Sequence, residues 1–423
     1  MMIFTRNQVN RSLLLILFIA LVARMAAAFY VGDTVSGLSG AHDEISYSML
    51  GQRFATGHGM TFPEPWYPWI AADAPQSYYS YTISLFLAGI YMLFGYHPLV
   101  ARILMGLMST AIVWLLFLVG RRLFDPTVAA IASAIAAIYA YLIFYGVTLV
   151  TETPFTLALL IALYLAIRMR AGEVTGVGAW FTLGLVLAIA VLLRMAVIFF
   201  IPILLLWLYY AVRKETKLWL VAIPLVVIGL AVLPLTIRNY QLWQQFLLLE
   251  AQFGHVFWNG NHPGHLGDFH PFQVFPIPPE VLASNNDVLI TNTLLRMGIE
   301  NVLNRPVDFV MLTLTRLREF FLFWPTTDST LSANVLRILS FGLILPFALY
   351  GFFANLRRFH ELAPIYLFIV VHTGIYAVTW TMIRYRIPLD PFFILFAAYS
   401  LQVVYQQLIQ PRALTQPVQQ PAA

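Results

Sequence analysis

The sequence contains no cysteine and few charged residues, and both shortages exclude kinds of chemistry. Without cysteine the chain has no disulfide, no thiol nucleophile and no cysteine metal ligand. Charged residues make up only 10% of the 423 residues, whereas hydrophobic residues make up 60%, and the mean hydropathy is +0.79. A water-soluble protein of this composition would expose too much apolar surface. The composition therefore predicts a membrane protein, and the net charge of +5 gives no indication of nucleic-acid binding.

Long apolar runs dominate the sequence instead. Most of them come close to the roughly 20 residues that an α-helix needs to cross a bilayer. Repeated runs of this length predict an all-α polytopic membrane protein. The runs cover residues 13–31, 81–96, 99–120, 127–147, 153–169, 177–193, 196–212, 218–236, 307–325, 333–355, 363–381 and 387–406.

The basic residues between these runs indicate which runs cross the membrane. If all of them crossed with the N-terminus inside, the basic loops at 121–122, 168–170 and 213–217 would lie outside, against the positive-inside rule. Run 81–96 is short, and run 307–325 carries charged residues at amphipathic spacing. If these two runs lie along the surface as interfacial helices, about ten spans remain and every short basic loop lies inside.

This topology predicts a single transmembrane domain over residues 1–406, with large external regions at about 32–98 and 237–332. Residues 407–423 are rich in Gln, Pro and Ala, and we expect them to form a disordered cytoplasmic tail. The first run could pass for a signal peptide, but its length and its internal Arg24 favour an uncleaved first span.

The first external region begins with an acidic pair, in the segment Gly40-Ala41-His42-Asp43-Glu44-Ile45-Ser46-Tyr47. One interpretation is that Asp43 caps a short helix ending near Gly57, as Asp commonly does. The other interpretation is that one carboxylate is a catalytic base that faces a membrane-embedded substrate. The local sequence favours the cap, whereas the rest of the chain favours the base.

Further charged residues lie at span ends that the topology brings to the same external face. Glu152 lies between the third and fourth spans, and Arg194 lies in the tight turn between the fifth and sixth. Arg238 follows the seventh span, and Arg384 and Arg386 open the last one. Snorkelling to lipid headgroups explains any single arginine, but several arginines at one face indicate a site.

Carboxylates and arginines at one membrane face suit a particular reaction. Arginine can clamp a lipid-linked phosphate with paired hydrogen bonds, while a carboxylate removes a proton from an attacking hydroxyl. A phosphate leaving group needs its developing charge stabilised, and fixed cations provide that stabilisation.

Three other features carry weaker indications. Four histidines lie between residues 255 and 270, but their spacing matches no familiar zinc motif and is typical of a polar loop. The Trp and Tyr residues at 66–81 are typical of an interfacial belt, although stacking on a sugar ring is the alternative. Arg24, inside the first run, either pairs near the site or snorkels outward.

Several of these segments form an ordered set. The set comprises Asp43-Glu44 with Tyr47, residues 74–79 leading into 93–95, residues 100–124, residues 151–154, Leu193-Arg194 and residues 384–388. In this order the segments resemble the motifs of GT-C fold glycosyltransferases. The nearest resemblance is to family 39, which includes protein O-mannosyltransferases and the bacterial transferase that adds aminoarabinose to lipid A.

The resemblance implies a fold and a reaction. The fold would be a GT-C-like bundle of about ten transmembrane helices with external juxtamembrane helices. The enzyme would move a sugar from a polyprenyl-phosphate donor to a hydroxyl of a lipid or glycan acceptor, with inversion, at the external face of the plasma membrane. No metal or other cofactor would be required, because arginines supply the positive charge.

The resemblance also implies roles for individual residues. Asp43 would be the general base, and Glu44 and Glu152 would orient hydroxyl groups of the acceptor or donor. The residues expected to hold the donor phosphate are Arg194, Arg384 or Arg386, and more weakly Arg238. The residues expected to contact the acceptor or the sugar are Tyr47, Tyr78 and Tyr79.

The chain also departs from the family pattern. Asp73 stands where such enzymes often carry a basic residue, and the sequence shows neither a large soluble C-terminal domain nor a lumenal insert. These departures favour a lipid or glycan acceptor over a protein.

Three rival functions stay open. A membrane scaffold without catalysis would keep its function in Asp43→Asn. A transporter or lipid flippase would place ionisable residues near the middle of the bilayer. An oligosaccharide polymerase or ligase would use arginines of a large late loop, here Arg296, Arg305, Arg316 and Arg318.

Overall fold

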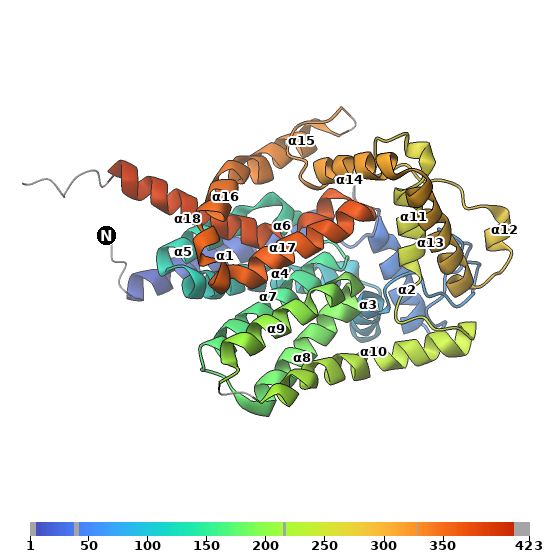
Figure 1. Cartoon of the computed structure of the whole chain (residues 1–423), viewed down its shortest axis with the longest axis horizontal. Coiled ribbons are helices and arrows are strands. Elements are labelled where there is room, and N and C mark those ends of the chain that lie inside the picture. Colours follow the sequence, from blue (N-terminus) through green and yellow to red (C-terminus); the bar gives the residue numbers. More distant parts are fainter. Residues whose placement is uncertain (1–5, 38–41, 215–216, 328, 410–423) are drawn as a thin grey trace, which may run out of the picture.

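The helices form a long bundle with a group of shorter helices at one end (Figure 1). This computed structural model describes residues 6–37, 42–214, 217–327 and 329–409. Within these ranges, eight helical segments are long and apolar enough to cross a membrane, and all eight coincide with predicted spans. They are α1 (Arg6–Val31), α4 (Pro98–Leu123), α7 (Glu152–Arg170), α8 (Gly176–Leu193), α9 (Ile201–Val212) with the preceding turn Met195–Phe199, α10 (Ala222–Trp243) with the preceding turn Leu218–Val221, α15 and α16 (Leu331–Arg337 and Leu343–Ala354) joined by one π-turn, and α17 (Phe359–Val378) with the preceding turn Leu356–Arg358.

The two other predicted spans have a different form. Run 127–147 breaks at Tyr139, whose extended backbone separates α5 (Pro126–Ile138) from α6 (Ala140–Phe144). Run 387–406 lies in α18 (Asp390–Ile409), which follows the one-turn helix Ile383–Arg386. Helix α18 continues through residue 409, three residues into the predicted disordered tail, and the remainder of that tail lies outside the described ranges.

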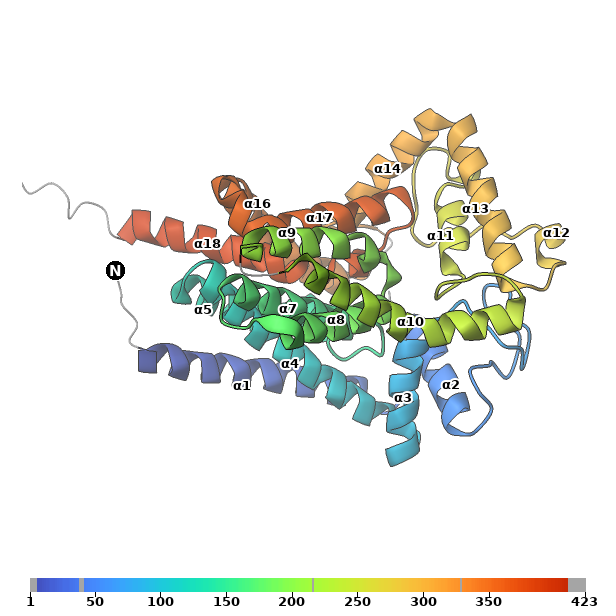
Figure 2. The same ribbon diagram turned by 60° about the horizontal axis from the view of Figure 1, so that its bottom comes forward.

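Both regions that the sequence predicts to be external contain helices, which are called the external helices below. The runs expected to lie along the surface form α3 and α14, which have only 14 and 15 residues and are too short to cross a bilayer. Figure 2 shows the external helices gathered at the end of the bundle away from the N-terminal end of α1. These helices are α2 (Asp43–Ala55), α3 (Tyr81–Phe94), α11 (Gln252–Gly260), α12 (Pro279–Leu282), α13 (Asp287–Asn304) and α14 (Pro306–Phe320).

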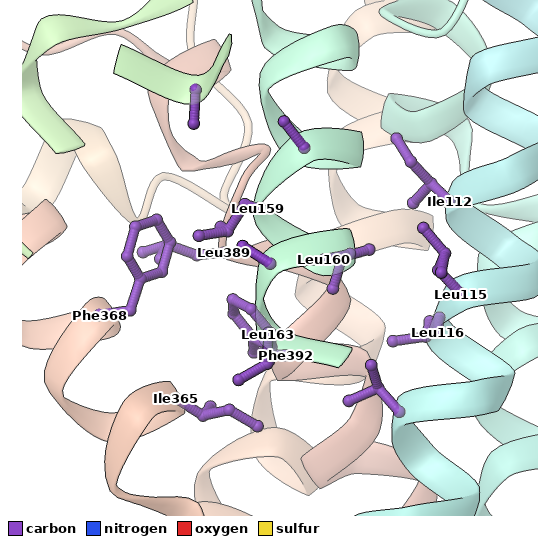
Figure 3. Packing of buried hydrophobic residues seen from close by; sticks show 14 of the residues in the cluster. Ile112, Leu115, Leu116, Leu159, Leu160, Leu163, Ile365, Phe368, Leu389 and Phe392 are labelled. Atoms are coloured by element: carbon purple, nitrogen blue, oxygen red, sulfur yellow. The ribbon is translucent and has the colours of Figure 1, made fainter. Parts of the chain in front are cut away.

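Helix α7 lies at the centre of the packing. Its apolar window is 67% buried, compared with 17% for α1. Because lipid is as apolar as the helices, close packing rather than exclusion from water holds such faces together. The packing of α7 fixes the position of its first residue, Glu152. Figure 3 shows the apolar packing around α7. Its residues Leu159, Leu160 and Leu163 have Ile112, Leu115 and Leu116 of α4 on one side, and Ile365, Phe368, Leu389 and Phe392 on the other.

Arg24 of α1 caps the C-terminal end of α5. The last carbonyls of a helix lack partners inside that helix. The Arg24 guanidinium donates hydrogen bonds to the carbonyl oxygens of Ala136 and Ala137 at 3.1 and 3.0 Å, and to Ser109 Oγ at 2.8 Å. The side chain is fully buried. Both predicted roles are therefore wrong: Arg24 neither pairs near the site nor reaches outward.

The basic loops meet at the other end of the bundle, as the topology predicts. Glu173, in the loop after α7, pairs with Arg122 at the end of α4 and accepts a hydrogen bond from Arg168 Nε at 3.2 Å. Arg358 Nη2 donates to the carbonyl of Leu123 at 2.5 Å. Helix α7 therefore runs from Glu152 at the end that carries the external helices to a basic cluster at the opposite end.

Candidate active site

Four charged side chains form one chain of ion pairs at the end of the bundle that carries the external helices. Arg384 Nη2 pairs with Asp43 Oδ2, and Arg384 Nε lies 3.4 Å from Glu152 Oε1. Arg194 Nη2 donates to the same Glu152 oxygen at 2.5 Å. The sequence places these residues far apart, and the fold brings two acids and two arginines from four segments together.

Each member of this cluster lies at the end of a helix. Asp43 is the first residue of α2 and Glu152 is the first residue of α7, so both carboxylates lie at the positive ends of helix dipoles. Arg194 has an extended backbone between α8 and the next turn. Arg384 lies in the one-turn helix before α18. Helices that start and stop at the same membrane face therefore carry the polar residues to one place.

Exposure differs across the cluster. The Asp43 side chain is 34% exposed, whereas those of Arg384 and Glu152 are 6% and 1% exposed. Burial alone would lower the pKa of Arg384, but the carboxylates of Asp43 and Glu152 raise it well above its ordinary value. Burial also lowers the pKa of Arg194, but the carboxylate of Glu152 raises it, and the overall shift is upward. Both guanidiniums stay charged, and Asp43 is the member most open to solvent.

Neighbouring side chains fix the two guanidiniums. Arg194 Nη1 donates to the Tyr376 hydroxyl at 2.8 Å, and its Nε donates to Thr151 Oγ1 at 3.1 Å. The Tyr385 ring lies against both arginines, with its centroid 5.1 Å from Arg194 Cζ and 5.4 Å from Arg384 Cζ. Donors held in this way can stabilise an anion without first reorganising.

Glu250 is a further acid near this cluster, and it is not among the site residues predicted from the sequence. It lies between α10 and α11, and two side chains of α10 hold this stretch by donating to the carbonyls of Leu248 and Leu249 at 2.7 and 2.9 Å. Burial raises the pKa of Glu250 to about 7, although the Ser80 hydroxyl and the charge of Arg194 act in the opposite direction. An acid directly after three leucines is the signal that could have identified it.

Comparisons with known proteins support the predicted fold. Residues 80–239 match the model of a family described as dolichyl-phosphate-mannose-protein mannosyltransferase, and this stretch includes Glu152 and Arg194. A search of curated proteins found no match. The oligosaccharyltransferase of Archaeoglobus fulgidus in its apo form aligns with 97% of this chain at a TM-score of 0.60 and 15% identity. The chain has a GT-C glycosyltransferase fold.

Two further solved structures were compared with this GT-C chain. The complex of Archaeoglobus fulgidus AglB with an inhibitory peptide and a dolichol-phosphate aligns at a TM-score of 0.58 and 14% identity, over 97% of this chain and 52% of that one. ArnT from Cupriavidus metallidurans bound to undecaprenyl phosphate aligns at 0.41 and 16% identity, over 96% and 81% of the two chains. The chain spans about half, 52%, of the apo oligosaccharyltransferase. The predicted all-α polytopic fold and the resemblance to GT-C membrane glycosyltransferases are confirmed.

Glu44 lies outside the ion-pair cluster, although it follows Asp43 directly. Successive residues of a helix point about 100° apart, so Glu44 faces α4 instead. It pairs with Arg102 at 3.1 Å, and both side chains are fully buried. The Leu149 N–H donates to the same carboxylate oxygen at 3.3 Å. This position corrects the expectation that Glu44 orients a substrate hydroxyl, because its side chain is fully buried against Arg102.

The predicted cap is also incorrect. Helix α2 begins at Asp43 itself, and the N-cap position is His42, which has a helical backbone and makes no side-chain cap hydrogen bond. The Asp43 carboxylate pairs with Arg384 instead.

Two of the four predicted phosphate-binding arginines lie elsewhere. Arg386 is fully buried, pairs with Asp390 at 2.9 Å and lies 3.4 Å from the ring centroid of Phe341. Arg238 donates to the backbone carbonyl of Gln76 at 3.2 Å and lies over the Tyr81 ring. Arg194 and Arg384 are therefore the two of the predicted set that contact the acids of the site.

The three predicted tyrosines form an aromatic cluster beside the site. The Tyr78 hydroxyl is 2.8 Å from His255 Nδ1, and the Tyr79 hydroxyl donates to the carbonyl of Tyr67 at 2.9 Å. Tyr47 packs edge-on against Tyr79, with their centroids 6.1 Å apart, and lies within electrostatic reach of the site acids. The Tyr78 hydroxyl therefore holds His255 and the Tyr79 hydroxyl holds the backbone of Tyr67, whereas the expected contact of these tyrosines with a substrate stays a prediction.

Among the described residues, the histidines of the second external region form no metal site, and its arginines have partners within the protein. Within the described ranges, no three or more His, Asp or Glu side chains are grouped so as to hold a metal ion. His265 Nε2 is 3.1 Å from the carbonyl of Asn259. Arg316 is buried and donates to the carbonyl of Thr379. The remaining arginines of this region pair with nearby acids, in the pairs Arg296–Glu300, Arg305–Asp308 and Arg318–Asp268.

Proposed function

We propose that the protein is a membrane glycosyltransferase that moves a sugar from a polyprenyl-phosphate donor to a hydroxyl of a lipid or glycan acceptor. The chain of ion pairs from Asp43 through Arg384 and Glu152 to Arg194 carries this proposal. It combines a partly exposed carboxylate with two fixed cations at one end of the bundle. The match to a mannosyltransferase family supports the reaction class, and the dolichol-phosphate in the AglB complex supports the donor class.

The donor phosphate would bind to Arg194 and Arg384. The cluster is electrically neutral, because its two acids balance its two arginines. An incoming phosphate diester would replace the Asp43 carboxylate on Arg384, since guanidinium groups bind both anions with similar geometry. This exchange would release Asp43 at the moment when the donor is in place.

Asp43 would then act as the general base. The acceptor hydroxyl gives its proton to the Asp43 carboxylate, and its oxygen attacks the anomeric carbon opposite the phosphate. The bond from that carbon to the phosphate oxygen breaks, and its electron pair leaves with polyprenyl phosphate. Arg194 and Arg384 stabilise the charge that the phosphate gains. One displacement inverts the anomeric centre, and the proton on Asp43 passes to water.

Glu152 would position the two arginines. Its oxygen Oε1 contacts both guanidiniums, and its side chain is 1% exposed. It therefore holds the arginines at a fixed separation. In this scheme the protein needs no metal, because the arginines supply the positive charge. The site would open to the external face of the plasma membrane.

The positions of the charges do not favour a transporter. That function would require ionisable groups at mid-membrane that change partners. Arg24 is the charged residue expected there, and its donors are used by Ser109 and the carbonyls at the end of α5.

The test is transfer of label from a panel of polyprenyl-phosphate sugars by membranes that contain the wild type, Asp43→Asn or Glu300→Gln. Glu300 is an acid on α13 whose side chain is 60% exposed, so its variant controls for the loss of one carboxylate. We expect transfer by the wild type and by Glu300→Gln, and a rate lower by about 10²–10⁴-fold for Asp43→Asn.

Folding is checked separately by thermal unfolding, which Asp43→Asn should leave nearly unchanged. Equal transfer by the wild type and by Asp43→Asn would remove Asp43 as the base. No transfer from any donor by correctly inserted wild type would contradict the proposed function.

A further inference from the structure

A cavity of about 340 Å³ lies among the external loops. It is formed by residues 67–68, His255, residues 274–277 and Leu282. Its volume lies in the lower part of the range for small-molecule pockets, roughly 300–1,000 Å³. These residues belong to segments between the spans, so a lipid chain would have to leave the bilayer to enter it. A water-soluble group, such as the sugar end of a larger molecule, can reach it directly.

Tyr67 lines this cavity and lies within electrostatic reach of Asp43. Its ring is 50% exposed and lines the cavity. Partial burial raises the pKa of Tyr67 to about 12, and the charge of Asp43 adds to this increase. The Tyr79 hydroxyl fixes the backbone of Tyr67 from behind, by donating to its carbonyl at 2.9 Å.

The wall of the cavity selects against charge. None of its lining residues is Asp, Glu, Lys or Arg. Burial lowers the pKa of His255 to about 4, so its imidazole is neutral at physiological pH. A charged ligand would lose its hydration without gaining an ion pair. The aromatic rings of Tyr67 and Phe275 instead offer flat apolar surfaces, which suit the C–H face of a sugar ring.

His255 supplies a polar atom without a partner. Its Nδ1 pairs with the Tyr78 hydroxyl at 2.8 Å, which fixes the ring. Its Nε2 is buried and has no hydrogen-bond partner among the described residues. Buried polar atoms are rarely unpaired in native proteins. His255 lines the cavity, so a ligand hydroxyl that displaced the side chains covering this nitrogen would satisfy it.

We infer that this cavity is the acceptor subsite and that it binds an uncharged sugar ring. The apolar face of the ring packs on Tyr67 and Phe275, and one hydroxyl bonds to His255 Nε2. The assignment to the acceptor rests on the proposed function, whereas the binding of a neutral sugar does not. The acceptor is then a glycan or the sugar part of a glycolipid.

Binding is tested by saturation-transfer NMR on the full-length protein in nanodiscs without donor. The probes are methyl glycosides of glucose, mannose, galactose and N-acetylglucosamine, with methyl glucuronide as the charged counterpart. We expect at least one neutral glycoside to bind and the glucuronide not to bind. Tyr67→Ala should weaken binding about fivefold to tenfold through loss of ring contact. The matched control is Tyr240→Ala on α10, a tyrosine that is 55% exposed.

Several outcomes would overturn the inference: no neutral glycoside binds, the glucuronide binds equally well, or Tyr67→Ala binds as the wild type does. A second substitution, Ile277→Glu, places a carboxylate in the cavity wall and should also abolish binding of neutral glycosides.

Transfer assays separate this inference from the proposed function. Tyr67→Ala should raise the KM for the acceptor about fivefold to tenfold and leave the KM for the donor unchanged. If the wild type transfers sugar but binds none of the neutral glycosides, the subsite inference fails and the proposed function stands. If it binds a glycoside but transfers nothing, the assignment to an acceptor fails together with the proposed function.

Discussion

The acidic pair Asp43-Glu44 supplies two ion pairs with opposite properties. Asp43 pairs with Arg384, and its side chain is 34% exposed. Glu44 pairs with Arg102, and neither side chain is exposed. These two neighbouring acids therefore have different roles, because successive side chains of helix α2 point in different directions. Asp43 reaches Arg384, whereas Glu44 points into the bundle toward Arg102. An ion pair that a ligand can reach can exchange partners, whereas a fully buried pair stabilises one arrangement.

Arg384 and Arg386, which lie two residues apart near the C-terminal end of the sequence, show the same contrast. Arg384 contacts both site acids, whereas Arg386 is fully buried against Asp390. We therefore expect substitutions in the Asp43–Arg384 pair to reduce activity. Substitutions in the fully buried pairs Glu44–Arg102 and Arg386–Asp390 should instead reduce stability.

The largest effect should follow from breaking the buried pair with Glu44→Gln. This substitution leaves Arg102 buried without a counter-charge, which costs about 3–5 kcal/mol. We expect a large drop in the temperature of thermal unfolding, measured by tryptophan fluorescence in detergent. Transfer per folded molecule should stay near the wild-type rate. An unfolding temperature equal to that of the wild type would contradict this prediction.

The substitution Arg384→Gln should lower the rate of sugar transfer. Removing one fixed donor from a developing anion typically lowers kcat by about 10²–10³-fold. We expect a loss of this size in single-turnover transfer, together with weaker donor binding. The matched substitution Arg386→Gln should lower the unfolding temperature and leave the rate of the folded fraction nearly unchanged. Equal rate losses in the two variants, measured per folded molecule, would argue against the contrast between these arginines.

Glu250 should make stability depend on pH. Its pKa of about 7 in the folded protein exceeds its ordinary value of 4.5. Between these pH values the folded state binds more protons than the unfolded state, so stability should fall as pH rises from about 4.5 to 7 and then level off. Glu250→Gln should remove this decline. The measurement is the unfolding temperature at several pH values for both proteins, and parallel curves would contradict the prediction.

The smallest effect should come from Asp125, at the basic end of the bundle. Its carboxylate caps α5 by accepting hydrogen bonds from the N–H groups of Thr127 and Val128 at 2.7 and 3.0 Å. Asp125→Ala should lower stability by about 1 kcal/mol and leave transfer unchanged. A change in transfer would show that this end of the bundle is coupled to the site.

The sequence was sufficient to predict the bundle and part of the site. Apolar run length and basic loops indicate the spans and their direction, and the direction brings Asp43, Glu152, Arg194 and Arg384 to one face. The sequence alone is enough to place these four residues at one face, because a residue at the end of a predicted span lies at a known depth in the membrane.

The orientation of individual side chains could not be predicted in the same way. Arg384 and Arg386 lie in one turn, and only the packing of Arg386 against Asp390 and Phe341 separates their roles. The role of Glu44 could be recognised only from its contact with the distant Arg102. The role of Glu250 could be recognised only from the burial of the loop that carries it. Both depend on contacts between segments that the sequence places far apart, and hydropathy carries no information on such contacts.

The cap that Arg24 forms on α5 has a consequence for biosynthesis. Helix α1 leaves the ribosome before α4 and α5, which supply all the acceptors of Arg24 outside its own helix. Until those helices arrive, α1 must hold a cation in the bilayer at a cost of about 2.5–3.5 kcal/mol. We therefore expect α1 to insert incompletely on its own and to settle only when α5 docks, which makes the first helix of the chain one of the later ones to reach its final position.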